Sequence, residues 1–158
     1  MKKFIFLFLL ALPIAFVSCS DDGKDLPDVS FSLAYENAVD VDGTLYVVQG
    51  TDFTVTSITV TNNEPNKAAF INAATYYWDG YFLGTSYEAP YGIEIAIPED
   101  ATTGRHSLQI ECPVFAVDKS IATALVSYRV EVVASADDIP AGGEAVSTFK
   151  PTIKEASN

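Results

Sequence analysis

Residues 73–98 read AATYYWDGYFLGTSYEAPYGIEIAIP and contain seven of the chain's aromatic side chains together with its clearest turn signal. Asp79 and Gly80 stand between two runs of β-forming residues, YYW before them and YFL after them. A two-residue type I′ turn needs a positive φ at both central positions, and an Asp-Gly pair adopts this geometry readily. The stretch therefore predicts a tight β-hairpin, around which we expect the other strands to be arranged.

The two faces of this hairpin follow from the position of its turn, because side chains alternate along each strand. One face would carry Tyr76, Trp78, Tyr81 and Leu83. We expect this face to lie in the core, where Trp78 would join two packed sheets. The other face would carry Tyr77 opposite Phe82. These two rings are the candidate binding patch, unless a neighbouring strand or loop covers them.

Alternating apolar and polar residues predict further strands before and after the hairpin. These segments are 29–35, 44–49, 52–62, 93–97, 106–112 and 121–133. In 52–62 the apolar side chains change parity near Ser57, so we expect a β-bulge there. Residues 28–134 are then one all-β domain, an immunoglobulin-like antiparallel β-sandwich of about seven to eight strands. Its expected core includes Trp78, Ile95, Leu108, Ile110, Cys112 and Val130.

A set of short motifs recurs through the middle third of the chain: an apolar strand, Asp-Gly, an apolar-Gly-Thr step, Ala-Pro-aromatic and Gly-x-His-x-Leu. The residues that carry them are Tyr76, Trp78, Asp79, Gly80, Leu83, Gly84, Thr85, Ala89, Pro90, Tyr91, Gly104, His106 and Leu108. This pattern resembles the bacterial immunoglobulin-like domains of secreted and surface proteins. The resemblance implies an architecture and not an activity. It also implies a module that presents its loops, or the Tyr77/Phe82 face, to a glycan, a peptide or a neighbouring surface protein.

The N-terminus has the layout of a secretory signal, with two lysines before the short apolar run 4–17. The run is too short to span a membrane. It ends in the residues FVSC, which resemble a lipoprotein signal-peptide site, although Phe16 replaces the usual leucine. The resemblance implies that residues 1–18 are removed and that Cys19 carries acyl chains such as palmitate. The alternative is a plain signal peptide with a chance cysteine.

Residues 19–27 form an acidic polar segment that we interpret as a solvated tether. Its composition also resembles the acidic signals that follow the lipid-bearing cysteine in surface lipoproteins of the Bacteroidetes. Several acyl chains on one residue anchor a protein almost permanently, because each buried methylene contributes about 0.8 kcal/mol. We therefore expect an outer-membrane protein, held by Cys19 and exposed at the cell surface.

Charge narrows the range of partners. The chain has 9 basic and 21 acidic residues, and loss of Lys2 and Lys3 would leave 7 against 21, a formal charge of −14. A protein that binds nucleic acids or anionic lipid headgroups needs a basic patch on its surface, so neither is an expected partner of this acidic chain. From 135 to 158, polar, charged and turn-forming residues dominate without an apolar period. This composition predicts a flexible tail.

No motif in the sequence predicts catalysis, a cofactor or a metal. The nucleophile elbow Gly-x-Ser-x-Gly, a phosphate loop and a clustered metal-ligand set are all missing from it. His106 is the single histidine, expected to be packed and hydrogen-bonded, and Cys112 is expected to be a buried, reduced thiol. Residues 40–43, DVDG, have part of a calcium-loop spacing, but we interpret them as a turn. The sequence thus predicts a non-catalytic binding or adhesion module of unknown ligand, with a structural spacer or accessory subunit of an envelope assembly as the alternative.

Overall fold

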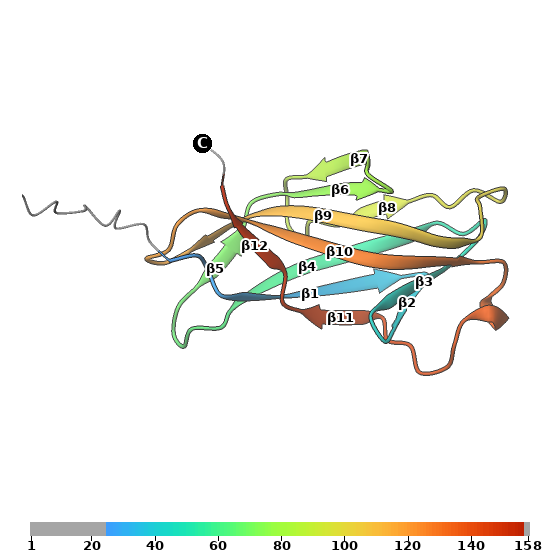
Figure 1. Ribbon diagram of the computed structural model, residues 1–158, viewed down its shortest axis with the longest axis horizontal. Coiled ribbons are helices and arrows are strands. Elements are labelled where there is room, and N and C mark those ends of the chain that lie inside the picture. Colours follow the sequence, from blue (N-terminus) through green and yellow to red (C-terminus); the bar gives the residue numbers. More distant parts are fainter. Residues whose placement is uncertain (1–24, 157–158) are drawn as a thin grey trace, which may run out of the picture.

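The computed structural model describes residues 25–156, which form a two-layer β-sandwich (Figure 1). The four-stranded sheet, sheet A, contains β1 (Val29–Glu36), β4 (Phe53–Asn62), β8 (Ile93–Ile95) and β11 (Val146–Phe149). The eight-stranded sheet, sheet B, contains β2 (Ala38–Val41), β3 (Thr44–Val48), β5 (Ala69–Ile71), β6 (Ala74–Trp78), β7 (Tyr81–Ser86), β9 (Gly104–Ala116), β10 (Ala122–Val133) and β12 (Thr152–Glu155). A short 3₁₀ turn covers Ala136–Asp138.

The strand order confirms the predicted immunoglobulin-like sandwich. Sheet A runs β11-β1-β4-β8, and sheet B runs β2-β3-β10-β9-β6-β7, with β12 beside β10 and β5 beside β9. Residues 25–156 form twelve strands instead of the expected seven or eight, and β3 lies parallel to β10. None of residues 25–156 belongs to a helix long and apolar enough to cross a membrane.

The core lies between the two sheets and follows the predicted alternation. On β10 the inward parity is buried and the outward parity is more exposed. Five of the six expected core residues are buried, namely Ile95, Leu108, Ile110, Cys112 and Val130. The β-bulge is also confirmed: Ala34 pairs with Ser57 and Tyr35 with Val55, which leaves Thr56 as the extra residue of β4.

The loop after β7 closes over this bulge. The Ile58 amide donates a hydrogen bond to the Pro90 carbonyl oxygen at 3.0 Å. At Gly92 the backbone passes so close to β4 that a Cβ would lie 2.4 Å from the Val55 carbonyl oxygen. Only glycine fits at this position, because the neighbour is backbone and cannot move aside.

The hairpin forms as expected, but part of its predicted core face is wrong. Asp79 and Gly80 have φ values of 49° and 81°, and Trp78 pairs with Tyr81. Leu83 is an extra, bulged residue, since Tyr77 pairs with Phe82 and Tyr76 with Gly84. Of the predicted core face, Tyr76 is fully buried and Trp78 half-buried, whereas Tyr81 is 78% and Leu83 40% exposed. The physical reason is that β7 is the edge of sheet B, where the smaller sheet A does not cover the whole inward face.

Trp78 still joins the two sheets, although it is not fully buried. Its ring lies 6.2 Å from that of Phe53 on β4. The indole packs against the core from the rim of the sandwich, together with the half-buried Ile93. The fully buried aromatic of the hairpin is Tyr76, whose hydroxyl donates a hydrogen bond to the Tyr91 carbonyl oxygen.

The prediction of a flexible tail from 135 to 158 is wrong for its described part. Residues of β11 pair with β1, where Phe149 lies opposite Phe31, and residues of β12 pair with β10. Ser147 is buried and its hydroxyl donates to the Asp40 carboxylate. The domain begins earlier than predicted as well, because Pro27 is buried. Both ends of the described chain therefore belong to the sandwich.

Candidate functional site

The hairpin turn is fixed to the neighbouring strand β9 by one carboxylate. The Asp79 amide donates to the Ser107 carbonyl oxygen at 2.9 Å, and the Ser107 amide donates back to Asp79 Oδ1 at 2.7 Å. Asp79 Oδ2 lies 2.7 Å from His106 Nδ1. The positive φ that places Asp79 in the turn thus also directs its carboxylate onto β9.

His106 is packed and hydrogen-bonded, as expected. Its Nε2 lies 2.8 Å from the Thr102 carbonyl oxygen, and its ring stacks on Trp78 at 5.3 Å. Partial burial lowers the pKa of His106, but the hydrogen bonds with Asp79 and Thr102 outweigh it and raise this pKa above its ordinary value. For Asp79 the two effects have the opposite signs. Partial burial raises the pKa of this carboxyl, but its hydrogen bonds with His106 and Ser107 outweigh burial and hold the pKa below its ordinary value. The Asp79–His106 pair stabilises the hairpin. Both ring nitrogens of His106 already have hydrogen-bond partners.

The candidate patch lies on the side of sheet B that faces away from the core. Tyr77 alternates with the buried Tyr76, and it pairs with Phe82 across the hairpin. The Phe82 side chain is 63% exposed and Tyr77 is half-buried. Their ring centroids are 6.0 Å apart, with the planes at 67°. The structure thus brings the two predicted residues together as an outward aromatic pair, which we call the outer aromatic patch.

The outer aromatic patch continues across sheet B through the strand register. Tyr77 lies opposite Gln109 on β9, and Gln109 lies opposite Ser127 on β10. Both of these polar side chains are exposed. One row of outward side chains therefore runs from Phe82 through Tyr77 and Gln109 to Ser127.

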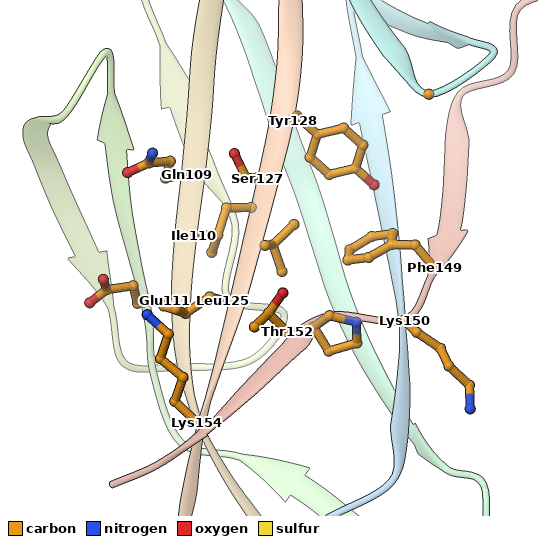
Figure 2. Close-up of a pocket in the computed structure, with 13 residues that line it drawn as sticks. Gln109, Ile110, Glu111, Leu125, Ser127, Tyr128, Phe149, Lys150, Thr152 and Lys154 are labelled. Carbon is orange, nitrogen blue, oxygen red and sulfur yellow. The ribbon is translucent and has the colours of Figure 1, made fainter. Parts of the chain in front are cut away.

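Ser127 belongs to a groove of about 720 Å³ on the same face. Figure 2 shows Gln109, Ser127, Thr152 and Lys154 around it, with Leu125 between them and the rings of Tyr128 and Phe149 beside it. The groove exists because β10 changes its neighbour. Along this edge β12 pairs with β10 up to Leu125, and β3 pairs from Arg129 onward, so neither strand covers the stretch between them.

The far wall of this groove was missed by the sequence analysis. It is formed by Phe149, Lys150, Pro151 and Thr152, where the chain crosses from β11 in sheet A to β12 in sheet B. Phe149 is held by edge-on packing against Tyr128, with 5.3 Å between ring centroids. The available signal was weak: one aromatic residue and an isolated isoleucine within a polar, proline-containing segment.

The remaining predicted residues contribute little to this face. Cys112 is a free, buried cysteine, and burial raises its pKa to about 12, which makes it a poor nucleophile. Asp42 and Gly43 form the expected turn, with φ values of 51° and 76°, and the Gly43 amide donates to Asp40 Oδ1. Residues 25–156 contain no group of three or more His, Cys, Asp or Glu side chains that could hold a metal ion. Cys19 lies outside the described residues.

Comparisons with known proteins add no further identification. No protein-family model matches the sequence, and no curated protein matches it significantly. Among solved structures, the fibronectin(III)-like modules of Clostridium thermocellum CbhA are similar, at 16% sequence identity and a TM-score of 0.41. The match covers 68% of this chain and 47% of that chain, so this chain spans about half the length of the structure it matches. At this distance the likeness carries no argument about this chain.

Proposed function

We propose that this chain is a non-catalytic surface lipoprotein, anchored by Cys19 at the outer membrane, whose sandwich binds a polymeric ligand across the outer face of sheet B. The observation that carries this proposal is the continuity of the outer aromatic patch with the groove. A contiguous apolar patch on the surface of a small domain marks an interaction site, and here the exposed Phe82 adjoins the half-buried Tyr77. Here it leads directly into a groove whose volume is typical of ligand sites.

A neutral glycan chain fits the chemistry of this face best. Sugar rings have C–H faces, which pack on the negative faces of aromatic rings such as Phe82. Their hydroxyl groups both donate and accept hydrogen bonds, and the face offers amide, hydroxyl and charged partners for both roles, including Gln109, Ser127 and Lys154. An acidic chain with a formal charge of −14 after signal removal disfavours polyanionic polymers. The open groove suits an extended chain more than a small enclosed molecule.

The anchor gives this binding face its place of action. A ligand captured by a lipid-anchored module stays close to the membrane, where it is available to other envelope proteins. Replacing the anchor residue, Cys19→Ala, is expected to move the protein from the membrane to the soluble fraction. Retention of that variant in membranes would contradict lipidation.

Binding is tested with the double variant Tyr77→Ala/Phe82→Ala in affinity electrophoresis against soluble mannan, xylan, β-glucan and amylopectin. We expect at least one polysaccharide to retard the native protein, and the double variant to lose at least about tenfold in affinity, a loss of about 1.4 kcal/mol. The matched control is Tyr87→Ala, since Tyr87 is also exposed but lies in the loop after β7. The thermal midpoint of the double variant should stay within about 3 °C of the native value, because Phe82 is mostly exposed.

The alternatives give different results in the same preparation. A pull-down from cell envelopes that depends on Tyr77 and Phe82 but survives glycosidase treatment would identify a protein or peptide partner instead. Retardation that is equal for the native protein and the double variant would move the site away from the outer aromatic patch. If neither assay detects a ligand, the structural spacer role is the better account.

A further inference from the structure

A second group of exposed apolar side chains lies at the end of the sandwich where the described chain begins. Its exposed members are Leu26, Phe70, Val117 and Ile121, and together with the half-buried Phe115 they form what we call the tether-end patch. Phe70 pairs with Phe115 between β5 and β9, and their rings stack at 5.1 Å with only 11° between the planes. Leu26, Phe70, Val117 and Ile121 are each at least 42% exposed. Four of the nine large hydrophobic side chains that are exposed among residues 25–156 are therefore gathered at this end.

Phe115, Val117 and Ile121 are close because of the turn that joins β9 to β10. Val117 follows β9 directly, and Ile121 directly precedes β10. Phe115 has the same strand parity as the outward-facing Gln109, so it lies on the outer face of sheet B. Figure 1 shows this turn, β5 and the first described residues at one end of the molecule.

The incoming chain is fixed to the same turn. The Ser120 amide donates to the Asp25 carbonyl oxygen at 3.1 Å, and Lys119 Nζ lies 4.0 Å from the Asp25 carboxylate. Asp25 is six positions after Cys19. A chain spans at most about 3.5 Å per residue, so Cys19 cannot be more than about 20 Å from Asp25. If the proposed acyl chains of Cys19 lie in a bilayer, the tether-end patch is kept within that distance of the lipid surface.

We propose that the tether-end patch rests on the lipid bilayer and holds the sandwich in a preferred orientation. This inference depends on the proposed lipid anchor. Aromatic and branched side chains enter the boundary between headgroups and acyl chains. The tether also gives the patch a high effective concentration at the membrane, so even a weak contact with lipid would form. Two of the basic groups beside the patch, Lys119 and Lys67, both pair with Glu64, so this carboxylate offsets their attraction for anionic lipid. A zwitterionic surface is therefore the matching partner.

This orientation would place the ligand-binding face above the headgroups. Gln109 lies six residues before Phe115 on β9. At about 3.3 Å per residue, the outer aromatic patch is up to about 20 Å from the part of the strand that contacts lipid. The long strand β9 would thus connect a membrane-contacting end with a binding surface exposed to the outside.

The test uses the full-length, lipidated protein in phosphatidylcholine vesicles. A spin label is attached at Val117→Cys, and the matched control carries it at Tyr81→Cys, an exposed site on the hairpin. Cys112 is buried and does not compete for the label. Flotation of the vesicles reports the anchor, and relative collision with oxygen and with a water-soluble nickel complex reports the depth of the label. We expect the label at 117 to collide at least about twofold more with oxygen, relative to nickel, than the label at 81.

Each result has a separate meaning. If the protein does not float with the vesicles, both the anchor and the lipid contact are wrong. Flotation with equal water exposure at 117 and 81 overturns the lipid contact alone. Protection of 117 in cell envelopes but not in vesicles also overturns it, since the patch then meets a protein. A variant with Phe70→Asp and Ile121→Asp should still float, while its label at 117 moves into water.

Discussion

Replacing Asp79 with asparagine tests how the hairpin is held against β9. Asparagine also tolerates a positive φ, so the turn itself should survive. The Oδ1 atom can still accept from the Ser107 amide, but His106 loses its carboxylate partner. A hydrogen bond to a charged group contributes about 1.5–3 kcal/mol, and the Asp79 side chain is 39% exposed, so solvent screening reduces this to about 1 kcal/mol. We expect a thermal midpoint about 4 °C lower.

The difference in unfolding free energy between Asp79→Asn and the native protein should depend on pH in a defined direction. The pKa of His106 is raised in the folded protein. Its contribution to the free energy of unfolding is therefore fully present below pH 6.5, the ordinary pKa, and is lost as the pH rises through the pKa of the folded state. The pKa of Asp79 is lowered in the folded protein. Its contribution to the free energy of unfolding is therefore present above pH 3.8, the ordinary pKa, and is lost as the pH falls through the pKa of the folded state. Urea denaturation should thus show a larger difference at about pH 5 than at about pH 9.

An NMR titration supplies the direct check, because the chain has one histidine and its ring signal needs no assignment. The pKa of His106 should be above its ordinary value in the native protein and lower in Asp79→Asn. Equal histidine pKa values in the two proteins, or a difference in stability that does not change with pH, would refute this account of the hairpin.

Three further predictions concern the packing of the sandwich. Gly92→Ala should destabilise the fold by about 2 kcal/mol in urea denaturation, because its Cβ would meet a carbonyl oxygen of β4. The control is Gly84→Ala, where the nearest atom is a side-chain carbon at 3.6 Å. This variant should lose clearly less stability. Cys112 should not react with a thiol reagent at about pH 8 in the native state and should react at once in denaturant, since burial raises its pKa to about 12; equal rates would contradict its burial. Phe149→Ala should lower the free energy of unfolding by about 2 kcal/mol, because its ring packs against two core aromatics. Phe82→Ala should lower it by less than about 0.5 kcal/mol, since this ring is exposed. The reverse order would show that the C-terminal strands add little to the stability of the sandwich.

The sequence predicted those parts of the fold that depend on neighbouring residues. The Asp79-Gly80 turn is decided by two adjacent φ values, and the bulge beside Ser57 is visible as a change of parity within one strand. The outward direction of Tyr77 and Phe82 follows from the turn and from alternation. These features were therefore available without any knowledge of the other sheet.

Features that depend on distant contacts were not available from the sequence. Tyr81 has the right parity for the core but lies at an edge strand, where coverage depends on how far sheet A extends. The strands β11 and β12 are short and mostly polar, and β11 finds its partner β1 more than one hundred positions earlier in the chain. The groove was missed for the same reason, because its wall is built by Phe149 and the residues that follow it.

Backbone amide chemical-shift mapping locates a glycan bound to the outer face of sheet B. The native protein is titrated with the polysaccharide that retards it most, in the form of soluble oligosaccharides. We expect the largest shifts along one row, at Tyr77, Phe82, Gln109 and Ser127, and then at Thr152 across the groove. Shifts confined to the loops or to sheet A, or no shifts at all, would contradict binding at this face.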